Sequence, residues 1–337
     1  MKKIFATLCV LALIAGASSC KKDETEQTPG SSSNPSTPPE NINYPEYHEG
    51  QYIPIMKIST VTEGSTLTEE WTWNGDKLDY ITTHGDSEGE IRFTYDGDYI
   101  TSVTNGPQQE MRYSYADGKI TTIAVNDGNT TMVEATLLRN NSGKISGATL
   151  DVDDEYLRDM ISAMTGFGSK DGADSKFDIT SNTITLAYEW NNQNIATQRL
   201  NVSVDIKLTQ EEYNSLKEVL PIPEQYQPYV DALVTTQGGL PLRLKMNDTT
   251  TYTYDTRINP HYCFWGTMIS AEVLSLNNVL TETTTGTVNV AALLMGMEIP
   301  LLSNPTPDYT EYEYEYNSKY YPTKVISGET ETSYTYK

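Results

Sequence analysis

The sequence predicts a mainly β protein: an antiparallel meander of tyrosine-rich hairpins that forms a strongly curved sheet or a soluble porin-like barrel, with two or three short helices packed on or in it. Three observations predict this fold. Pairs of aromatic residues recur before glycine-containing turns, the 337 residues include 24 tyrosines, and only a few short segments have helical patterning. Alternating aromatic and polar residues are typical of strands that bury one face.

Three consecutive segments carry the hairpin pattern. They begin at Trp71, Phe93 and Tyr113, and each has two aromatic residues flanking one other residue, then Asn-Gly or Asp-Gly, then a returning apolar segment. Asn-Gly and Asp-Gly favour the positive φ angles of tight hairpin turns. A fourth unit is expected around 140–143. Alternating tyrosines return at 312–316 and 334–336, where a strand would place all the rings on one face.

Three segments predict helices that interrupt the strands. The first, 153–164, begins with acidic residues, as favoured at a helix N-terminus, and has apolar residues three or four apart. The second, 209–220, begins with a Thr-x-x-Glu capping box and ends before Pro221. The third, 229–235, is short. The most apolar segment after residue 20, 287–302, fits a buried strand or a helix equally well.

The amino terminus predicts a lipoprotein signal peptide over residues 1–19. Lys2 and Lys3 precede an apolar run, 4–17, that is too short to span a bilayer. The run ends in small residues before Cys20, which resembles a lipobox with Ala17 in place of the usual leucine. We therefore expect diacylglycerol on Cys20. The alternative is a secreted protein in which Cys20 lies near an ordinary cleavage site.

After Cys20 the sequence predicts a tether and one large domain. Residues 21–24, Lys-Lys-Asp-Glu, are similar to the tag that sends Bacteroidetes lipoproteins to the outer face of the outer membrane. The alternative is that these charges only keep the tether solvated. The rest of 20–43 is a flexible Ser/Thr/Pro linker, and 44–337 is expected to form a single β-rich domain. The expected location is the outer membrane, lipid-anchored and facing the cell exterior.

The hairpins also suggest a family. The Tyr-x-Tyr-(Asn/Asp)-Gly units and the segment 312–324 look like an uncharacterised Bacteroidetes-type surface lipoprotein family, a domain of unknown function with a porin-like β fold. The resemblance covers most of 57–337. Similar hairpins occur in the Tyr-Asp repeats of Rhs-type shell proteins, but only Tyr95 and Tyr254 are followed by aspartate in that way. The family resemblance implies a fold and a location, and it supplies no catalytic residues.

Composition excludes several classes of function. The formal net charge of −23 disfavours binding to nucleic acid or directly to anionic lipid. Cys9 leaves with the predicted signal peptide and Cys20 is expected to be lipidated. Cys263 then remains alone, so no intramolecular disulfide is expected. The three histidines have no zinc-site spacing, and the acidic segment 151–155 lacks the later ligands of an EF-hand. We predict no catalytic residue, metal or cofactor.

Aromatic side chains are the strongest binding candidates, because flat rings stack on sugars and pack in protein interfaces. The loop 259–266 reads as a rigid aromatic loop. The sequence therefore predicts a membrane-anchored binding module for a glycan or a protein. The alternatives are a structural or envelope-interaction protein without a small ligand and, less favoured, a hydrolase. Each ring could instead belong to the core. The candidate ligand-binding residues are Trp71, Trp73, Trp190, Tyr262 and Trp265.

Overall fold

A computed structural model describes residues 53–85, 88–165, 177–217, 222–264, 269–294 and 296–337. The predicted signal peptide, the lipidation site Cys20, the linker 20–43 and the start of the domain lie outside the described residues, as does Trp265.

The structure is mainly β, with 69% strand and 12% helix, and its strands form one large antiparallel meander, which confirms the predicted fold class. Each strand from β1 to β13 pairs with the next strand in the chain. The first thirteen strands are β1 (Ile55–Thr62), β2 (Ser65–Asn74), β3 (Lys77–Gly85), β4 (Gly89–Asp96), β5 (Tyr99–Asn105), β6 (Gln109–Ala116), β7 (Lys119–Asp127), β8 (Thr130–Arg139), β9 (Ile145–Val152), β10 (Phe177–Asn191), β11 (Asn194–Thr209), β12 (Gly239–Ile258) and β13 (Asn277–Leu294).

The last strands bring the end of the chain back to its beginning. β13 pairs with both β14 (Met297–Pro305) and β15 (Asp308–Glu311). β16 (Glu313–Tyr316), β17 (Pro322–Ser327) and β18 (Thr330–Tyr336) follow, and β18 pairs with β1. Within the described residues the sheet is not closed, because β16 leaves β13 after Tyr312 and turns to β17. Of the two predicted architectures, the curved open sheet is therefore the one found.

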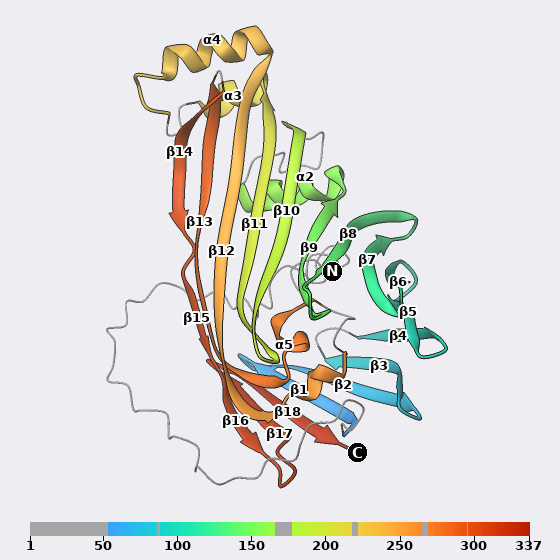
Figure 1. The fold of residues 1–337 in the computed structure, drawn as a ribbon. Coiled ribbons are helices and arrows are strands. Elements are labelled where there is room, and N and C mark those ends of the chain that lie inside the picture. Colours follow the sequence, from blue (N-terminus) through green and yellow to red (C-terminus); the bar gives the residue numbers. More distant parts are fainter. Residues whose placement is uncertain (1–52, 86–87, 166–176, 218–221, 265–268, 295) are drawn as a thin grey trace, which may run out of the picture.

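The turns of the first three hairpins follow the sequence pattern. Gly75, Gly97 and Gly118 have φ angles of 67°, 57° and 73°, which residues with a Cβ rarely adopt. The apolar segment 287–302, ambiguous in the sequence, forms strand: the end of β13 and most of β14. β13 and β14 lie beside β12, β11 and β10, and together these strands form the tall part of the sheet (Figure 1).

In the part of the chain that the structure describes, four short helices accompany the sheet, against the two or three that the sequence predicts. The first and second predicted helices are α2 (Asp154–Thr165) and α3 (Gln210–Leu216), and the third is α4 (Gln227–Gln237), which is longer than predicted. The fourth helix, α5 (Ala271–Leu274), had no sequence signal. Thr209 caps α3 by accepting a hydrogen bond from the Glu212 N–H at 3.1 Å, as the capping box predicts. α4 lies across the upper end of the tall strands (Figure 1).

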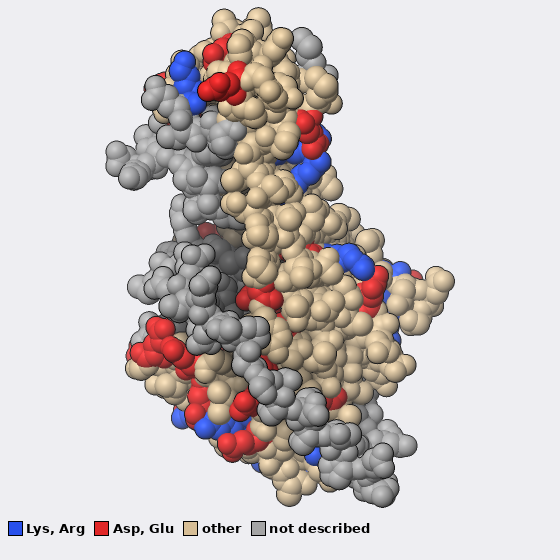
Figure 2. All heavy atoms as spheres, turned by 90° about the vertical axis from the view of Figure 1, so that its left-hand side faces the viewer, with Lys and Arg blue, Asp and Glu red and all other residues tan. Residues whose placement is uncertain are grey.

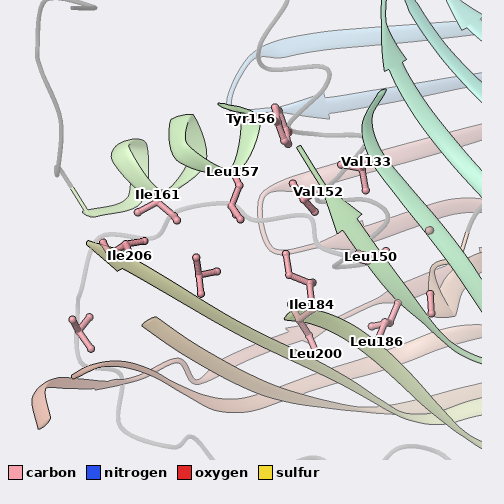
Figure 3. Packing of buried hydrophobic residues seen from close by; sticks show 14 of the residues in the cluster. Val133, Leu150, Val152, Tyr156, Leu157, Ile161, Ile184, Leu186, Leu200 and Ile206 are labelled. Atoms are coloured by element: carbon pink, nitrogen blue, oxygen red, sulfur yellow. The ribbon is translucent and has the colours of Figure 1, made fainter. Parts of the chain in front are cut away.

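The aliphatic core lies between α2 and the tall strands. Asp153 begins α2 by accepting hydrogen bonds from the N–H groups of Glu155 and Tyr156 at 3.0 and 3.1 Å. The acidic segment thus serves as a helix cap, as its sequence suggested. Leu157 and Ile161 then point from α2 toward the sheet, where they meet a set of buried aliphatic side chains (Figure 3): Val152, Ile184, Leu200 and Ile206.

Acidic side chains on the outer face of the tall strands are paired with basic ones. Asp205 accepts two hydrogen bonds from Arg243, at 2.6 and 2.7 Å, and the guanidinium holds the pKa of this carboxyl below its usual value. Glu298 bridges Arg243 and Lys245, at 2.9 and 2.8 Å. Figure 2 shows acidic and basic side chains in small groups, with uncharged residues covering most of the visible face. The net charge is therefore spread out rather than gathered in one acidic patch on this face.

A chain of side-chain hydrogen bonds explains the aromatic repeat. Near the turn of each participating hairpin, one side chain donates to the backbone carbonyl of the corresponding residue in the preceding hairpin. Tyr95, for example, donates to Leu78 O at 3.0 Å, and Tyr115 donates to Ile100 O at 2.8 Å. We call these side chains the donor belt: Trp73, Tyr95, Tyr115, Arg139, Trp190, Tyr254, Tyr314 and Tyr336.

A β-bulge accompanies the belt. The strand register shifts directly before Trp73, Tyr95 and Tyr115, and the same irregularity recurs at Arg139, Trp190 and Tyr254. A bulge interrupts the ladder and leaves backbone groups without their usual partner. The belt side chains supply a partner for the carbonyl next to the bulge of the neighbouring hairpin. The second aromatic residue of each repeat is thus required by the scaffold.

Removing one belt hydroxyl should weaken the fold measurably. We expect Tyr115→Phe to lower the free energy of unfolding by about 1 kcal/mol, because the ring stays while the Ile100 carbonyl loses its donor. Urea denaturation measures this. Tyr99→Phe is the matched control, since Tyr99 packs its ring 5.0 Å from that of Tyr115 but is 48% exposed and outside the belt. Equal stability of Tyr115→Phe and the control would contradict the role given to the belt.

Candidate functional site

The structure commits the indole N–H groups of three predicted binding residues to the protein itself. Trp73 donates to Ile55 O at 2.7 Å and Trp190 to Ile145 O at 2.8 Å, so both belong to the donor belt. Lys144 also lies over the Trp190 ring, 4.6 Å from its centre. Trp71 is only 6% exposed and donates to Glu69 at 3.0 Å. The three rings therefore contribute to the stability of the fold through these hydrogen bonds.

Two of the predicted residues nevertheless lie beside a wider group of aromatic side chains. The rings of Trp71 and Trp73 are 6.3 Å apart, and Trp71 is 6.5 Å from the ring of His261. His261 and the predicted Tyr262 both lie in the short 3₁₀ helix η1 (Pro260–Phe264). Trp190 is not part of these ring contacts.

The candidate site extends from His261 to two glutamates and three tyrosines at the lower end of the sheet. His261 comes from η1, Glu272 from α5, Glu282 from β13, Tyr334 from β18 and Tyr314 from β16. Tyr312 lies between β15 and β16. We call this group the aromatic–carboxylate cluster. Its members are far apart in the sequence and are brought together by the return of the last strands to β1.

Asn259, 3% exposed, fixes the two short helices that carry His261 and Glu272. Its Nδ2 donates to Ser275 O at 2.8 Å and to Glu272 O, while its Oδ1 accepts from the His261 N–H at 2.9 Å. η1 and α5 are thereby held against each other. As a result, His261 Nε2 lies 3.2 Å from Tyr334 Oη and 3.8 Å from Glu272 Oε1.

Glu282 is the most perturbed carboxyl of the cluster. It faces Tyr252 across the β12–β13 ladder, and its Oε1 accepts a hydrogen bond from Tyr312 at 3.3 Å. Burial raises the pKa of Glu282 to about 8, and repulsion from the carboxylates of Glu272 and Asp308 adds to the rise. The Tyr312 hydrogen bond opposes it without cancelling it. Glu282 therefore holds its proton at neutral pH.

Glu272 is the carboxylate whose charge raises the pKa values of several other members of the cluster. Burial raises the pKa values of Tyr314 and Tyr334, and the negative charge of Glu272 is the next cause for both, as it is for Glu282. One carboxylate thus acts on three groups from three strands. Its own side chain remains 56% exposed, so it is open to solvent beside rings that are largely desolvated. This combination of an accessible carboxylate, phenols and a neutral carboxyl can bind a polar ligand.

Sequence reasoning found the neighbourhood and missed most of its members. The loop 259–266 and Trp71 were singled out, and the alternating tyrosines were predicted to share one face. The ring distances confirm that prediction: 6.5 Å for Tyr312–Tyr314 and 6.3 Å for Tyr334–Tyr336. Nothing in the sequence distinguishes Glu272 or Glu282 among 46 acidic residues. Their role depends on strands that meet only in the folded sheet.

In the part of the chain that the structure describes, no group of three or more His, Cys, Asp or Glu side chains is arranged to hold a metal ion. No protein-family model matches the sequence, and no curated protein matches it. The candidate site therefore stands on its own geometry.

Glu282 should make the stability of the protein depend on pH. The folded state keeps the proton up to about pH 8, whereas the unfolded chain releases it near 4.5. The free energy of unfolding should therefore fall as pH rises between these values, by less than about 1.4 kcal/mol per pH unit because Glu282 is only half-buried. Glu282→Gln should flatten this slope and be the more stable protein at pH 8. Urea denaturation from pH 5 to 9 measures the slope, and Glu134→Gln, an exposed position on β8, is the control. An unchanged slope in Glu282→Gln would contradict the raised pKa.

Proposed function

We propose that this chain is a lipid-anchored cell-surface binding protein whose aromatic–carboxylate cluster holds part of a glycan. The observation that carries the proposal is the cluster itself: Glu272 is accessible to solvent next to half-buried tyrosine rings and a neutral carboxyl. Rings stack on the apolar face of a sugar, and carboxyl and phenol groups exchange hydrogen bonds with its hydroxyls. A protein ligand would have to place a side chain in the same position.

The anchor rests on the sequence before residue 44. The lipobox at Cys20 and the Lys-Lys-Asp-Glu segment 21–24 support lipidation and display on the outside of the outer membrane. The likeness of the hairpins to Bacteroidetes-type surface lipoproteins supports the same location. Among the described helices, none combines the length and the apolar character needed to cross a bilayer. We expect protease added to intact cells to remove the domain, whereas protection from protease would favour the periplasmic face.

The experiment that tests binding uses the mature chain purified in detergent, with tryptophan fluorescence as the readout. A panel of neutral, acidic and amine-bearing glycans is titrated, since Trp71 lies next to His261 and should report a ligand there. We expect saturable binding to one class, and Glu272→Gln to weaken it roughly tenfold. Glu134→Gln, which exchanges an exposed glutamate on β8, should bind as the wild type does. No response across the panel would contradict the proposal.

A structural or envelope-interaction role is the second candidate, and the donor belt is the observation that favours it. Eight side chains are spent on joining neighbouring hairpins, which suits a rigid scaffold as well as a binding protein. An assembly recovered from native membranes by crosslinking, together with a flat glycan panel, would support this role in place of binding.

A further inference from the structure

The hydroxyl donors of two cluster tyrosines, and the indole donor of the neighbouring Trp71, are used within the protein. The Tyr314 hydroxyl donates to Val279 O at 2.8 Å, and the Tyr312 hydroxyl donates to Glu282 at 3.3 Å. The Trp71 indole donates to Glu69 at 3.0 Å. A phenol whose proton is engaged keeps two lone pairs, so it can still accept a hydrogen bond. What the cluster offers a ligand is therefore mainly acceptors: phenol oxygens and the carboxylate of Glu272.

Among the described residues, carboxylates outnumber the basic groups around these acceptors; the basic groups are Arg257, which lies 5.5 Å from the centre of the Tyr316 ring, and His261, which lies 3.8 Å from Glu272. Besides burial and neighbouring phenols, the groups that raise the pKa values of Glu282, Tyr314 and Tyr334 are carboxylates. Glu272 acts on all three, and the others are Asp308, Asp255 and Glu69. The remaining groups near Glu282 are the phenols of Tyr252 and Tyr312. A positive charge placed beside Glu272 would relieve the repulsion that it exerts on Glu282.

The ring geometry is also suited to a cation. Tyr314 stacks on Tyr316 with centres 5.8 Å apart and planes at 21°, and Tyr334 stacks on Tyr336 at 6.3 Å and 13°. Stacking fixes the direction in which each ring presents its electron-rich face, and such faces attract ammonium groups. The same attraction is already used beside the cluster, where Arg257 lies over Tyr316 at 5.5 Å and over Tyr320 at 4.6 Å.

We propose that the aromatic–carboxylate cluster recognises a protonated primary amine carried by a sugar, with Glu272 as the counter-ion and the tyrosine oxygens as further acceptors. This inference rests on the proposed function, because it names the class of glycan that the same site binds. An ammonium group brings three donors and no acceptor, which complements a site whose Tyr312 and Tyr314 hydroxyls already donate within the protein. A neutral sugar brings hydroxyls that both donate and accept, so it matches the site less well.

Ligand binding should also displace a proton. At neutral pH Glu282 is protonated, and an ammonium group arriving beside Glu272 favours the ionised form of Glu282. The groups facing Glu282 are Glu272 from α5, Asp308 from β15, Tyr252 from β12 and Tyr312, and the basic His261 of η1 lies 3.8 Å from Glu272. Binding of the amine should therefore release protons near pH 7 and strengthen as pH rises toward 8 for an amine that stays charged.

Isothermal titration calorimetry on the mature protein in detergent tests the inference. The probes are glucosamine, glucose and N-acetylglucosamine, which share a ring and differ in charge, and n-butylamine, which carries the amine without the sugar. We expect glucosamine to bind roughly tenfold more tightly than either neutral sugar at pH 7. Butylamine should bind more weakly than glucosamine, because it lacks the ring. Heats measured in two buffers of different ionisation enthalpy should reveal proton release with glucosamine.

Variants separate the inference from the proposed function. Glu272→Gln should remove the preference for glucosamine, and Glu282→Gln should abolish proton release. Glu134→Gln should change neither, and urea denaturation confirms that each variant is folded. Neutral sugars binding as tightly as glucosamine would overturn the inference and leave the proposed function standing. Butylamine equalling glucosamine would assign the site to amines rather than to sugars, and no binding by any probe or by the glycan panel would overturn both.

Discussion

A Cys20→Ser variant is expected to lose its lipid and to leave the membrane fraction almost completely. The thioether that carries diacylglycerol needs the cysteine sulfur, and each buried CH₂ of an acyl chain contributes about 0.8 kcal/mol to membrane attachment. The two acyl chains of the proposed diacylglycerol would therefore supply nearly all of the affinity for the membrane. Metabolic labelling with radioactive palmitate, followed by membrane fractionation, measures both effects.

The control for this experiment is Ser18→Ala, which keeps a small residue two positions before the cysteine. It should be labelled and should sediment with membranes as the wild type does. A Cys20→Ser protein that still incorporates palmitate, or that stays with the membranes after a salt wash, would contradict the anchor at Cys20.

The largest loss of stability is expected from Leu242→Ala. Leu242 is fully buried on β12 and lies between Ile206 on β11 and Ala292 on β13. Truncation removes three carbons from a site walled by two paired strands that cannot both move inward. Such substitutions cost about 2–5 kcal/mol. Urea denaturation should therefore show a clearly lower midpoint with a similar slope.

Leu138→Ala is the matched control, because it makes the same chemical change at a position on β8 that is 47% exposed and lies outside the core. It should cost under about 0.5 kcal/mol. Equal effects at the two positions would mean that the β11–β13 face is not the packed interior of the domain.

Local features of the fold could be predicted from the sequence because local chemistry decides them. Asn-Gly and Asp-Gly fix the turns after Trp73 and Tyr95, and the Thr209 cap fixes the start of α3. Alternation then assigns each side chain to a face. The segment 287–302 could not be assigned, since an apolar run has no period of its own. Its conformation is decided by strand pairing: its first half, in β13, pairs with β12, and its second half, in β14, pairs with β13.

Closure of the sheet could not be predicted, because it depends on where the last strands go. β16 leaves β13 after Tyr312, and no pattern in the Tyr-Glu-Tyr-Glu-Tyr run marks that point. α5 has four residues and depends on Ser270 and Asn259 for its position, so it leaves almost no periodic signal.

Only the members of the candidate site that belong to rare residue types, such as tryptophan, could be singled out from the sequence. Tryptophans attract attention in a sequence, yet the structure uses Trp73 and Trp190 in the donor belt. The polar members of the cluster carry more of its chemistry, and their environment arises from burial. Glu282 gains its raised pKa from surrounding strands rather than from neighbours in the sequence.

The central claim, that the aromatic–carboxylate cluster holds the ligand, is tested most directly by proton NMR of the histidine side chains. The chain has three histidines, and a His261→Gln variant identifies the resonance of His261. His84, exposed on β3, serves as the internal reference. On titration with the glycan selected by the panel, the account predicts that the His261 signals shift in a saturable manner while those of His84 stay in place. Binding that leaves the His261 signals unchanged would place the ligand elsewhere and contradict the account.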